Sequence, residues 1–307
     1  MAYYQELTKN NLIRLLSSKL NTGELSLRGS DNKFVANLNV VWDGPWSHTN
    51  SSYQMQCYWW KDVTFHEIVE KQLPKDRWFV PLGCLDCYKV VVKPKTVEQL
   101  FALEKLQHRL NLPSKCGIEL RKEVFGNYGG YFYNRGLANG LTCYFTVKNA
   151  ISKDEILKPI LNDVDENGVP VRCILKRACT EMEHGVGPSD KWQPTEEQVD
   201  FEMELAQHFV NDVPVLRQSD MVLQEVHLKW IERAFNVGDE TVAKYNDGKP
   251  LHPGYVTYHH MIELADNNII KTDSKKEIDK HKQAKKEQVN MQDGVTKKKN
   301  HTIQKAN

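Results

Sequence analysis

Apolar and polar residues repeat with helical spacing most clearly between residues 96 and 110. In this segment, TVEQLFALEKLQHRL, the apolar positions include 97, 100, 103, 106 and 110. That spacing places them on one face of an α-helix. Thr96 and Gln99 stand three residues apart at its start, the spacing of a capping box. The pattern therefore predicts a helix that begins after Thr96 and buries one face.

Three apolar runs that end near a basic residue predict β-strands. They are CYKVVVK (87–93), CGIELR (116–121) and CILKR (173–177), and WFVPL (78–82) is a further short candidate. The segment FGNYGGYFYNRG (125–136) is rich in glycine and aromatic residues and is interpreted as a loop that leads into a helix over 137–150. The resulting order, strand-helix-strand-helix-strand, favours right-handed crossovers between parallel strands.

The predicted fold class is α/β (or α+β), with a mixed, mainly parallel central sheet and flanking helices. Two more helical patterns, over 194–210 and 219–235, follow the last strand. Residues 1–75 predict a smaller α+β segment with a helix near Tyr4–Leu20, a strand over 34–42 and a short helix opened by a capping box at Thr64–Glu67. We expect this segment to pack on a main domain of residues 76–270.

Charge is distributed unevenly along the chain. Residues 271–307 hold 11 Lys against 5 Asp and Glu, a net charge of +6, so with +1 for the whole chain residues 1–270 carry −5. The tail has no aromatic residue and few aliphatic ones, and such a composition cannot bury enough apolar surface to offset the entropy of ordering. The sequence therefore predicts a basic tail, disordered or ordered by a partner, that contacts nucleic acid or an acidic protein.

The hydropathy pattern argues against a membrane protein. No stretch of 18 apolar residues occurs, and the N-terminal segment has no continuous apolar core of the kind found in secretory signals. With no signal segment, the seven cysteines favour a reducing compartment, where thiols stay free or bind metal. The expected location is the cytoplasm.

Four cysteines are candidate metal ligands. Cys84 and Cys87 form a C-x-x-C pair, and Cys87, Cys116 and Cys173 each open a predicted strand. If these strands are parallel neighbours, the thiols line up at one edge of the sheet and suit tetrahedral zinc or an iron–sulfur cluster. The alternatives are buried thiols that pack as small apolar groups and a redox pair, which is disfavoured because a strand rather than a helix follows the motif.

The same strands end in basic residues. Lys93, Arg121 and Arg177 would then converge where the strands leave the sheet, which predicts a site for an anionic small molecule. Glu119 and His184 lie beside these ends and are the candidates for proton transfer. Ordinary solvent-facing charges at strand ends are the competing interpretation.

Two functions follow from these features. The first is a soluble, cysteine-ligated metal protein (zinc or iron–sulfur) with an anionic small-molecule site at the strand ends. The alternative is a non-enzymatic nucleic-acid-binding or assembly protein that uses the tail, residues 271–307, as its contact arm. An enzyme and a binding protein are both compatible with these residues.

Overall fold

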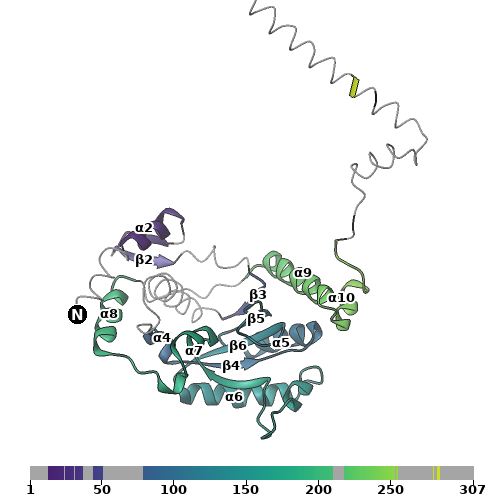
Figure 1. Ribbon diagram of the computed structural model, residues 1–307, viewed down its shortest axis with the longest axis horizontal. Coiled ribbons are helices and arrows are strands. Elements are labelled where there is room, and N and C mark those ends of the chain that lie inside the picture. Colours follow the sequence, from purple (N-terminus) through teal and green to yellow (C-terminus); the bar gives the residue numbers. More distant parts are fainter. Residues whose placement is uncertain are drawn as a thin grey trace, which may run out of the picture. The chain divides into compact units, whose positions relative to one another are not determined.

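The computed structural model of the chain describes residues 13–23, 25–30, 32–36, 44–50, 79–209, 218–252, 254, 279 and 282–283. The chain forms two compact units, Met1–Leu251 and His252–Asn307. The helices and strands bounded below all belong to the first unit (Figure 1). The predicted divisions after residues 75 and 270 stay predictions.

A five-stranded sheet organises the first unit. From one edge to the other its strands are β3 (Trp46–Thr49), β5 (Ser114–Ile118), β6 (Tyr128–Arg135), β4 (Cys87–Val92) and β7 (Cys173–Arg177). Each neighbouring pair is antiparallel. Two further strands, β1 (Leu25–Arg28) and β2 (Lys33–Ala36), form a separate antiparallel pair.

The prediction of a mainly parallel sheet is wrong, because a segment predicted as a loop forms a central strand. β6 pairs with β4 on one side and with β5 on the other. β4 and β5 therefore run in the same direction, but β6 lies between them. The order β4-α5-β5-β6-α6-β7 is the split β-α-β, or ferredoxin-like, topology, and the fold class is α+β.

The strongest helical patterns are confirmed. α5 (Val97–Leu110) begins after Thr96, whose hydroxyl accepts a hydrogen bond of 3.2 Å from the Gln99 backbone N–H. It ends at Asn111, which adopts the left-handed conformation with φ 50°. The other segments predicted to be long helices overlap α6 (Leu137–Ser152), α8 (Glu196–Ala206) and α9 (Asp220–Asn236).

The described part of the chain also contains shorter helices. They are α2 (Ile13–Asn21), α4 (Leu82–Leu85), α7 (Thr180–Val186), α10 (Ala243–Asn246) and the 3-10 turns η5 (Lys158–Asn162), η6 (Ser189–Lys191) and η7 (Glu240–Val242). The strand predicted over 78–82 is wrong, since α4 begins within it and residues 79–81 form no strand.

The predictions for the N-terminal segment fall only partly on described residues. The helix predicted near Tyr4–Leu20 overlaps α2, and the strand predicted over 34–42 overlaps β2. Residues 1–12 and 37–43 lie outside the described residues, as does the helix predicted from Thr64–Glu67.

One face of the main sheet carries the hydrophobic core. Helices α5, α6 and α9 bury side chains against strand residues such as Val90, Val92 and Phe132, and the helical contributors are Leu100, Leu103, Leu106, Cys143, Val147, Ile151, Val226, Trp230, Ile231 and Ala234. Gly130 permits the close approach of α5, since a Cβ at this position would collide with the Leu103 side chain. We call this side of the sheet the core face.

Candidate functional site

The opposite side of the sheet, the polar face, carries cations that surround one tyrosine. Tyr131 pairs with Val91 in β4 and with Lys115 in β5, so its ring stands on this face. The cationic groups of Lys89, Lys93, Lys115 and Arg121 lie 5.4 to 6.0 Å from the centre of the ring. We call these four residues, together with Tyr131 and Glu119, the Tyr131 cluster.

The Tyr131 hydroxyl joins three charged side chains. It donates a hydrogen bond of 2.6 Å to Glu119. It accepts hydrogen bonds from Lys93 Nζ at 3.2 Å and from Arg121 Nη2 at 3.1 Å. Burial, together with the adjacent Glu119 carboxylate, holds the pKa of Tyr131 well above its usual range. The phenol therefore stays protonated and fixes the positions of its neighbours.

Arg121 is compensated by two carboxylates. Its Nε and Nη2 donate to the two oxygens of Glu119 at 2.8 and 2.6 Å, and its Nη1 donates to Glu181 at 2.6 Å. Burial alone would raise the pKa of Glu119, but the hydrogen bonds from Arg121 and Tyr131 outweigh burial and lower that pKa to about 2. Glu119 is thus a permanent anion whose lone pairs are already engaged.

Lys93 is the cation of the cluster with the poorest compensation. The residue is only 6% exposed. Among the described residues, the hydrogen bond to Tyr131 is the only one that its ammonium group forms. Burial lowers the pKa of Lys93 to about 8, and the attraction of Glu119 offsets this only in part. Lys93 is thus a buried ammonium group that is still mostly protonated at pH 7 but loses its proton more readily than a solvated lysine does.

A second lysine of the same face has a direct counter-ion. Lys176, opposite Lys89 in the sheet, forms an ion pair with Glu183 of α7. Burial, together with repulsion by Lys89, lowers the pKa of Lys176 to about 8. Lys89 itself lies with its Nζ 3.1 Å from the Sγ atom of Cys179, the residue that precedes α7. The start of α7 is therefore tied to the polar face.

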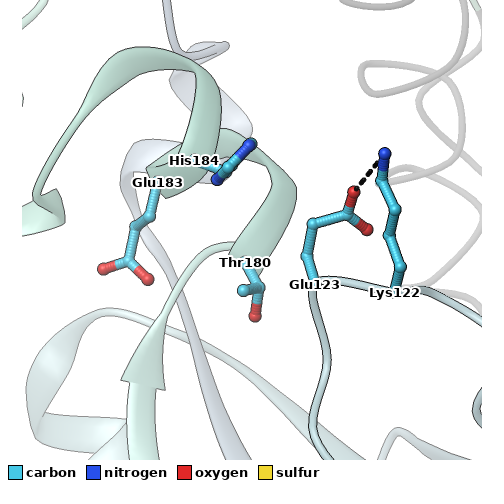
Figure 2. Close-up of a pocket in the computed structure, with 5 residues that line it drawn as sticks. All are labelled: Lys122, Glu123, Thr180, Glu183 and His184. Carbon is cyan, nitrogen blue, oxygen red and sulfur yellow. Dashed lines mark ion pairs between the residues drawn. The ribbon is translucent and has the colours of Figure 1, made fainter.

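A surface hollow of about 580 Å³ lies between α7 and the segment that follows β5. Figure 2 shows Lys122 and Glu123 on one wall and Thr180, Glu183 and His184 of α7 on the other. Lys122 and Glu123 form an ion pair of 3.7 Å. Because Lys122 follows Arg121 and Thr180 precedes Glu181, the Arg121–Glu181 ion pair joins the chain segments that form the two walls.

The structure brings together part of the predicted anion-binding set. Lys93 and Arg121 both contact Tyr131. β4 and β5 run in the same direction, so the two residues that follow them lie at the same end of the strands. Arg177 does not join them. β7 runs antiparallel to β4, so its last residue lies near the start of β4 rather than near Lys93. The Arg177 guanidinium instead donates to the backbone oxygens of Leu85 and Ser189 at 2.6 and 2.7 Å. The predicted convergence of all three basic residues is therefore wrong for Arg177.

The candidate proton-transfer residues occupy different places. Glu119 belongs to the Tyr131 cluster and is engaged with Arg121. His184 lines the hollow beside Glu183. No hydrogen bond or ion pair joins the two among the described residues, and their catalytic roles stay predictions.

The predicted cysteine ligands do not gather, because the strands that hold them are not parallel. Cys87 pairs with Arg135, whereas Cys173 pairs with Val92, five residues further along β4. At about 3.3 Å per residue the two cysteines are separated by about 16 Å, and they project from opposite faces.

Cys84 and Cys116 lie elsewhere again. Cys116 stands on the core face opposite Gly130, in the cross-strand row that contains Cys173 but about 14 Å, or three strand spacings, away from it. Cys84 packs with α7 residues in a separate apolar cluster. In the described part of the chain, no three His, Cys, Asp or Glu residues form a potential metal site. The binding of zinc or an iron–sulfur cluster therefore stays a prediction, and the described residues provide no set of ligands for it.

The sequence did not single out Tyr131 or Lys89 as parts of this site. Tyr131 was assigned to a loop, although YGGYFYNR has the aromatic content of a strand. Strand alternation does place Lys89 and Lys93 on one face, since they are four residues apart in CYKVVVK. Their burial beside a tyrosine depends on the central position of β6, which no local pattern indicates.

In comparisons with known proteins, no family model, curated protein or solved structure matches the chain. Within the described ranges, no helix has the length and apolar character needed to cross a membrane.

Proposed function

We propose that this chain binds an anionic small molecule at the Tyr131 cluster and that Lys93 contacts the anion. The observation that carries the proposal is the state of the Lys93 ammonium group, which is buried and, among the described residues, hydrogen-bonded only to a phenol. A buried charge without a counter-ion is costly, and an anion beside it removes much of that cost. Lys93 therefore has more to gain from a phosphate or carboxylate group than a solvated lysine has.

The neighbouring side chains support this role by being already compensated. Arg121 is engaged with Glu119 and Glu181, and Lys176 is paired with Glu183. The Tyr131 hydroxyl oxygen accepts hydrogen bonds from both Lys93 and Arg121. Arg121 and Tyr131 are thus positioning residues, whereas Lys93 offers an ammonium group that Glu119 and Tyr131 compensate only in part. Binding an anion in this way requires no reaction, and the roles predicted for His184 and Glu119 are additional to it.

Calorimetric titration of the full chain with inorganic phosphate and with oxalate at low ionic strength tests the proposal. We expect saturable binding that is at least about tenfold weaker in Lys93→Met, since a charge-assisted hydrogen bond contributes about 1.5–3 kcal/mol. The matched control is Lys105→Met, which changes an exposed lysine of α5. Equal affinities of the two variants, or no binding by the unmodified chain, would contradict the proposal.

The basic tail favours a second candidate function, the binding of nucleic acid or an acidic protein through residues 271–307. The net charge of +6 in this tail supports it, because lysines that neutralise phosphates release counter-ions and make binding weaken as salt rises. The same titration with a single-stranded oligonucleotide, compared with a chain truncated after Ile270, separates the two candidates. Loss of oligonucleotide binding with phosphate binding intact assigns nucleic-acid binding to the tail. Oligonucleotide binding that survives truncation excludes that role.

A further inference from the structure

Lys93 differs from the other buried lysines of the polar face in what its side chain contacts. Lys176 is tied by an ion pair to α7, and Lys89 lies with its Nζ 3.1 Å from the Sγ atom of Cys179. The Lys93 ammonium group, among the described residues, bonds only with the Tyr131 hydroxyl and forms no ion pair. Its nitrogen can therefore turn to an incoming molecule without first breaking an ion pair with one of these residues.

Burial makes this nitrogen a better nucleophile than that of a solvated lysine. Lys93 is 6% exposed, and burial is the main cause that lowers its pKa from 10.5 to about 8. The charge of Glu119 opposes this effect, and three nearby cations reinforce it: Arg121, Lys89 and Arg172. The neutral amine is thereby roughly 300 times more abundant at pH 7 than in an ordinary lysine. A desolvated lysine beside other cations is an arrangement that activates amines for attack on carbonyl groups.

The Tyr131 hydroxyl lies where such an attack needs a proton carrier. It is 3.2 Å from Lys93 Nζ, and it donates a hydrogen bond of 2.6 Å to Glu119. When an amine adds to a carbonyl group, the nitrogen becomes positive and the oxygen negative. A phenol beside both atoms can give its proton to the oxygen and take one from the nitrogen. Tyr131 then ends the step in the protonated state that its raised pKa favours.

We propose that Lys93 forms a Schiff base with a small oxo acid, a molecule in which an aldehyde or ketone group is bonded to a carboxylate. The oxo acid is a narrower class of the anion in the proposed function, on which this inference rests. The amine adds to the carbonyl carbon, and the carbonyl oxygen then leaves as water with two hydrogens from the nitrogen. A C=N bond replaces the C=O bond, and the step consumes no oxidant or reductant. Burial of Lys93 favours the product, because a site with little water slows hydrolysis of the C=N bond.

The cations around Tyr131 suit a carboxylate beside that carbonyl group. Lys93 Nζ and Arg121 Nη2 lie 3.2 and 3.1 Å from the same Tyr131 oxygen, so the two nitrogens are at most about 6.3 Å apart. One small molecule can therefore react with Lys93 and remain beside Arg121. The cationic groups of Lys89 and Lys115 also lie within 6.0 Å of the centre of the Tyr131 ring. Positive charge thus stays near the carboxylate when the Lys93 amine is neutral.

Reductive trapping of the full chain with glyoxylate, the smallest oxo acid, tests the inference. Glyoxylate and sodium cyanoborohydride are added at pH 7, the hydride converts a Schiff base into a stable carboxymethyl amine, and peptide mass spectrometry measures modification at each lysine. We expect Lys93 to react at least about tenfold faster than Lys105, an exposed lysine of α5. Lys93 should exceed Lys176 by a similar factor, because Lys176 also has a pKa of about 8 but has a direct counter-ion. Lys93→Met should lack the fast site.

Propanal is the matched aldehyde without a carboxylate. The ratio of modification at Lys93 to that at Lys105 removes the intrinsic reactivity of each aldehyde, and it should be at least about tenfold higher for glyoxylate. Oxalate, which has carboxylates but no aldehyde or ketone group, should lower this ratio by occupying the anion site. Tyr131→Phe should slow the reaction at Lys93 by at least about tenfold and leave Lys105 unchanged. Circular dichroism confirms that each variant is folded.

The results distinguish failure of the Schiff base from failure of the anion site. Equal modification of Lys93 and Lys105, in a chain that binds oxalate through Lys93, overturns the Schiff base and leaves the anion site standing. Equally fast reaction of Lys93 with glyoxylate and propanal, unaffected by oxalate, overturns the anion site and with it the oxo acid. Faster modification of Lys176 than of Lys93 would mean that the lowered pKa alone decides the reaction, and it too would overturn the inference.

Discussion

The two faces of the main sheet are built from the same strands and differ in the side chains that those strands bury. On the core face, Val90 and Val92 of β4 pack under three helices. On the polar face, the intervening positions of the same strand hold Lys89 and Val91, followed by Lys93. Burial of the first set stabilises the fold by about 1.5–3 kcal/mol for each large side chain. Burial of the lysines opposes folding unless a counter-ion is present.

This difference indicates where stability and function reside in the molecule. The buried side chains of the core face could be replaced by other apolar side chains of equal total volume, and the face would still be an apolar core. The polar face combines two lysines of lowered pKa with a carboxylate of lowered pKa, and strongly perturbed groups of this kind concentrate at functional sites. The proposed anion site therefore lies on the face that costs the fold free energy.

The largest expected effect comes from a cavity on the core face. Phe132→Ala removes a fully buried ring between β6 and the helices and should lower the free energy of unfolding by about 3–5 kcal/mol. Urea denaturation followed by circular dichroism measures it. Met221→Ala, at a residue of α9 that is 70% exposed, is the control and should change the value by less than about 0.5 kcal/mol. Similar losses in both variants would mean that this face is not the core.

A smaller loss is expected when the polar face loses its central anion. Glu119→Gln leaves Arg121 with Glu181 alone and should cost about 2–4 kcal/mol at neutral pH. Because the folded chain lowers the pKa of Glu119 from 4.5 to about 2, its stabilisation is present above pH 4.5 and is lost as the pH falls toward 2. The difference between the variant and the unmodified chain should therefore shrink in acid. A difference that is independent of pH would contradict the ion-pair assignment.

The smallest effect is expected for Lys93→Met, which removes a poorly compensated charge from the same face. We expect a change within about 1 kcal/mol of the unmodified chain at pH 7, in either direction. Since the pKa of Lys93 falls from 10.5 to about 8 on folding, the unfolded chain binds more protons between these values. Lys93 therefore makes the free energy of unfolding rise with pH from about 8 to 10.5, and the variant should lose part of that rise. A loss as large as that of Glu119→Gln would mean that Lys93 is an essential ion-pair partner.

The elements predicted well are those specified by local signals. The apolar spacing of 97–110 and the Thr96 cap determine α5 by themselves, because helical hydrogen bonds and capping involve only neighbours along the chain. The strand CYKVVVK was likewise predicted within a residue of β4. Lys93 and Arg121 both bond to Tyr131, because β4 and β5 end on the same side of the sheet with β6 between them, although the two strands are not adjacent as the sequence predicts.

The predictions that the structure contradicts are those that depend on the order and direction of the strands. Cys87, Cys116 and Cys173 share a position in their segments, but their distances follow from which strands pair and in which direction. β7 runs antiparallel to β4, so Cys87 and Cys173 lie at opposite ends of this strand pair and on opposite faces, and β6 separates β4 from β5. For the same reason Arg177 lies away from the predicted anion site and donates to the Leu85 backbone oxygen instead.

The sequence by itself determined the long helices, the alternation of residues along β4 and the separation of an acidic body from a basic tail, because periodicity and charge are properties of neighbouring residues. Only the tertiary structure decided that Tyr131 of β6 stands among Lys93, which follows β4, and Glu119 and Arg121, which follow β5. Strand pairing is a contact between distant segments, and its direction and register settle which side chains meet. The thiols that looked alike in sequence were separated by that register, and the cations were brought together by it.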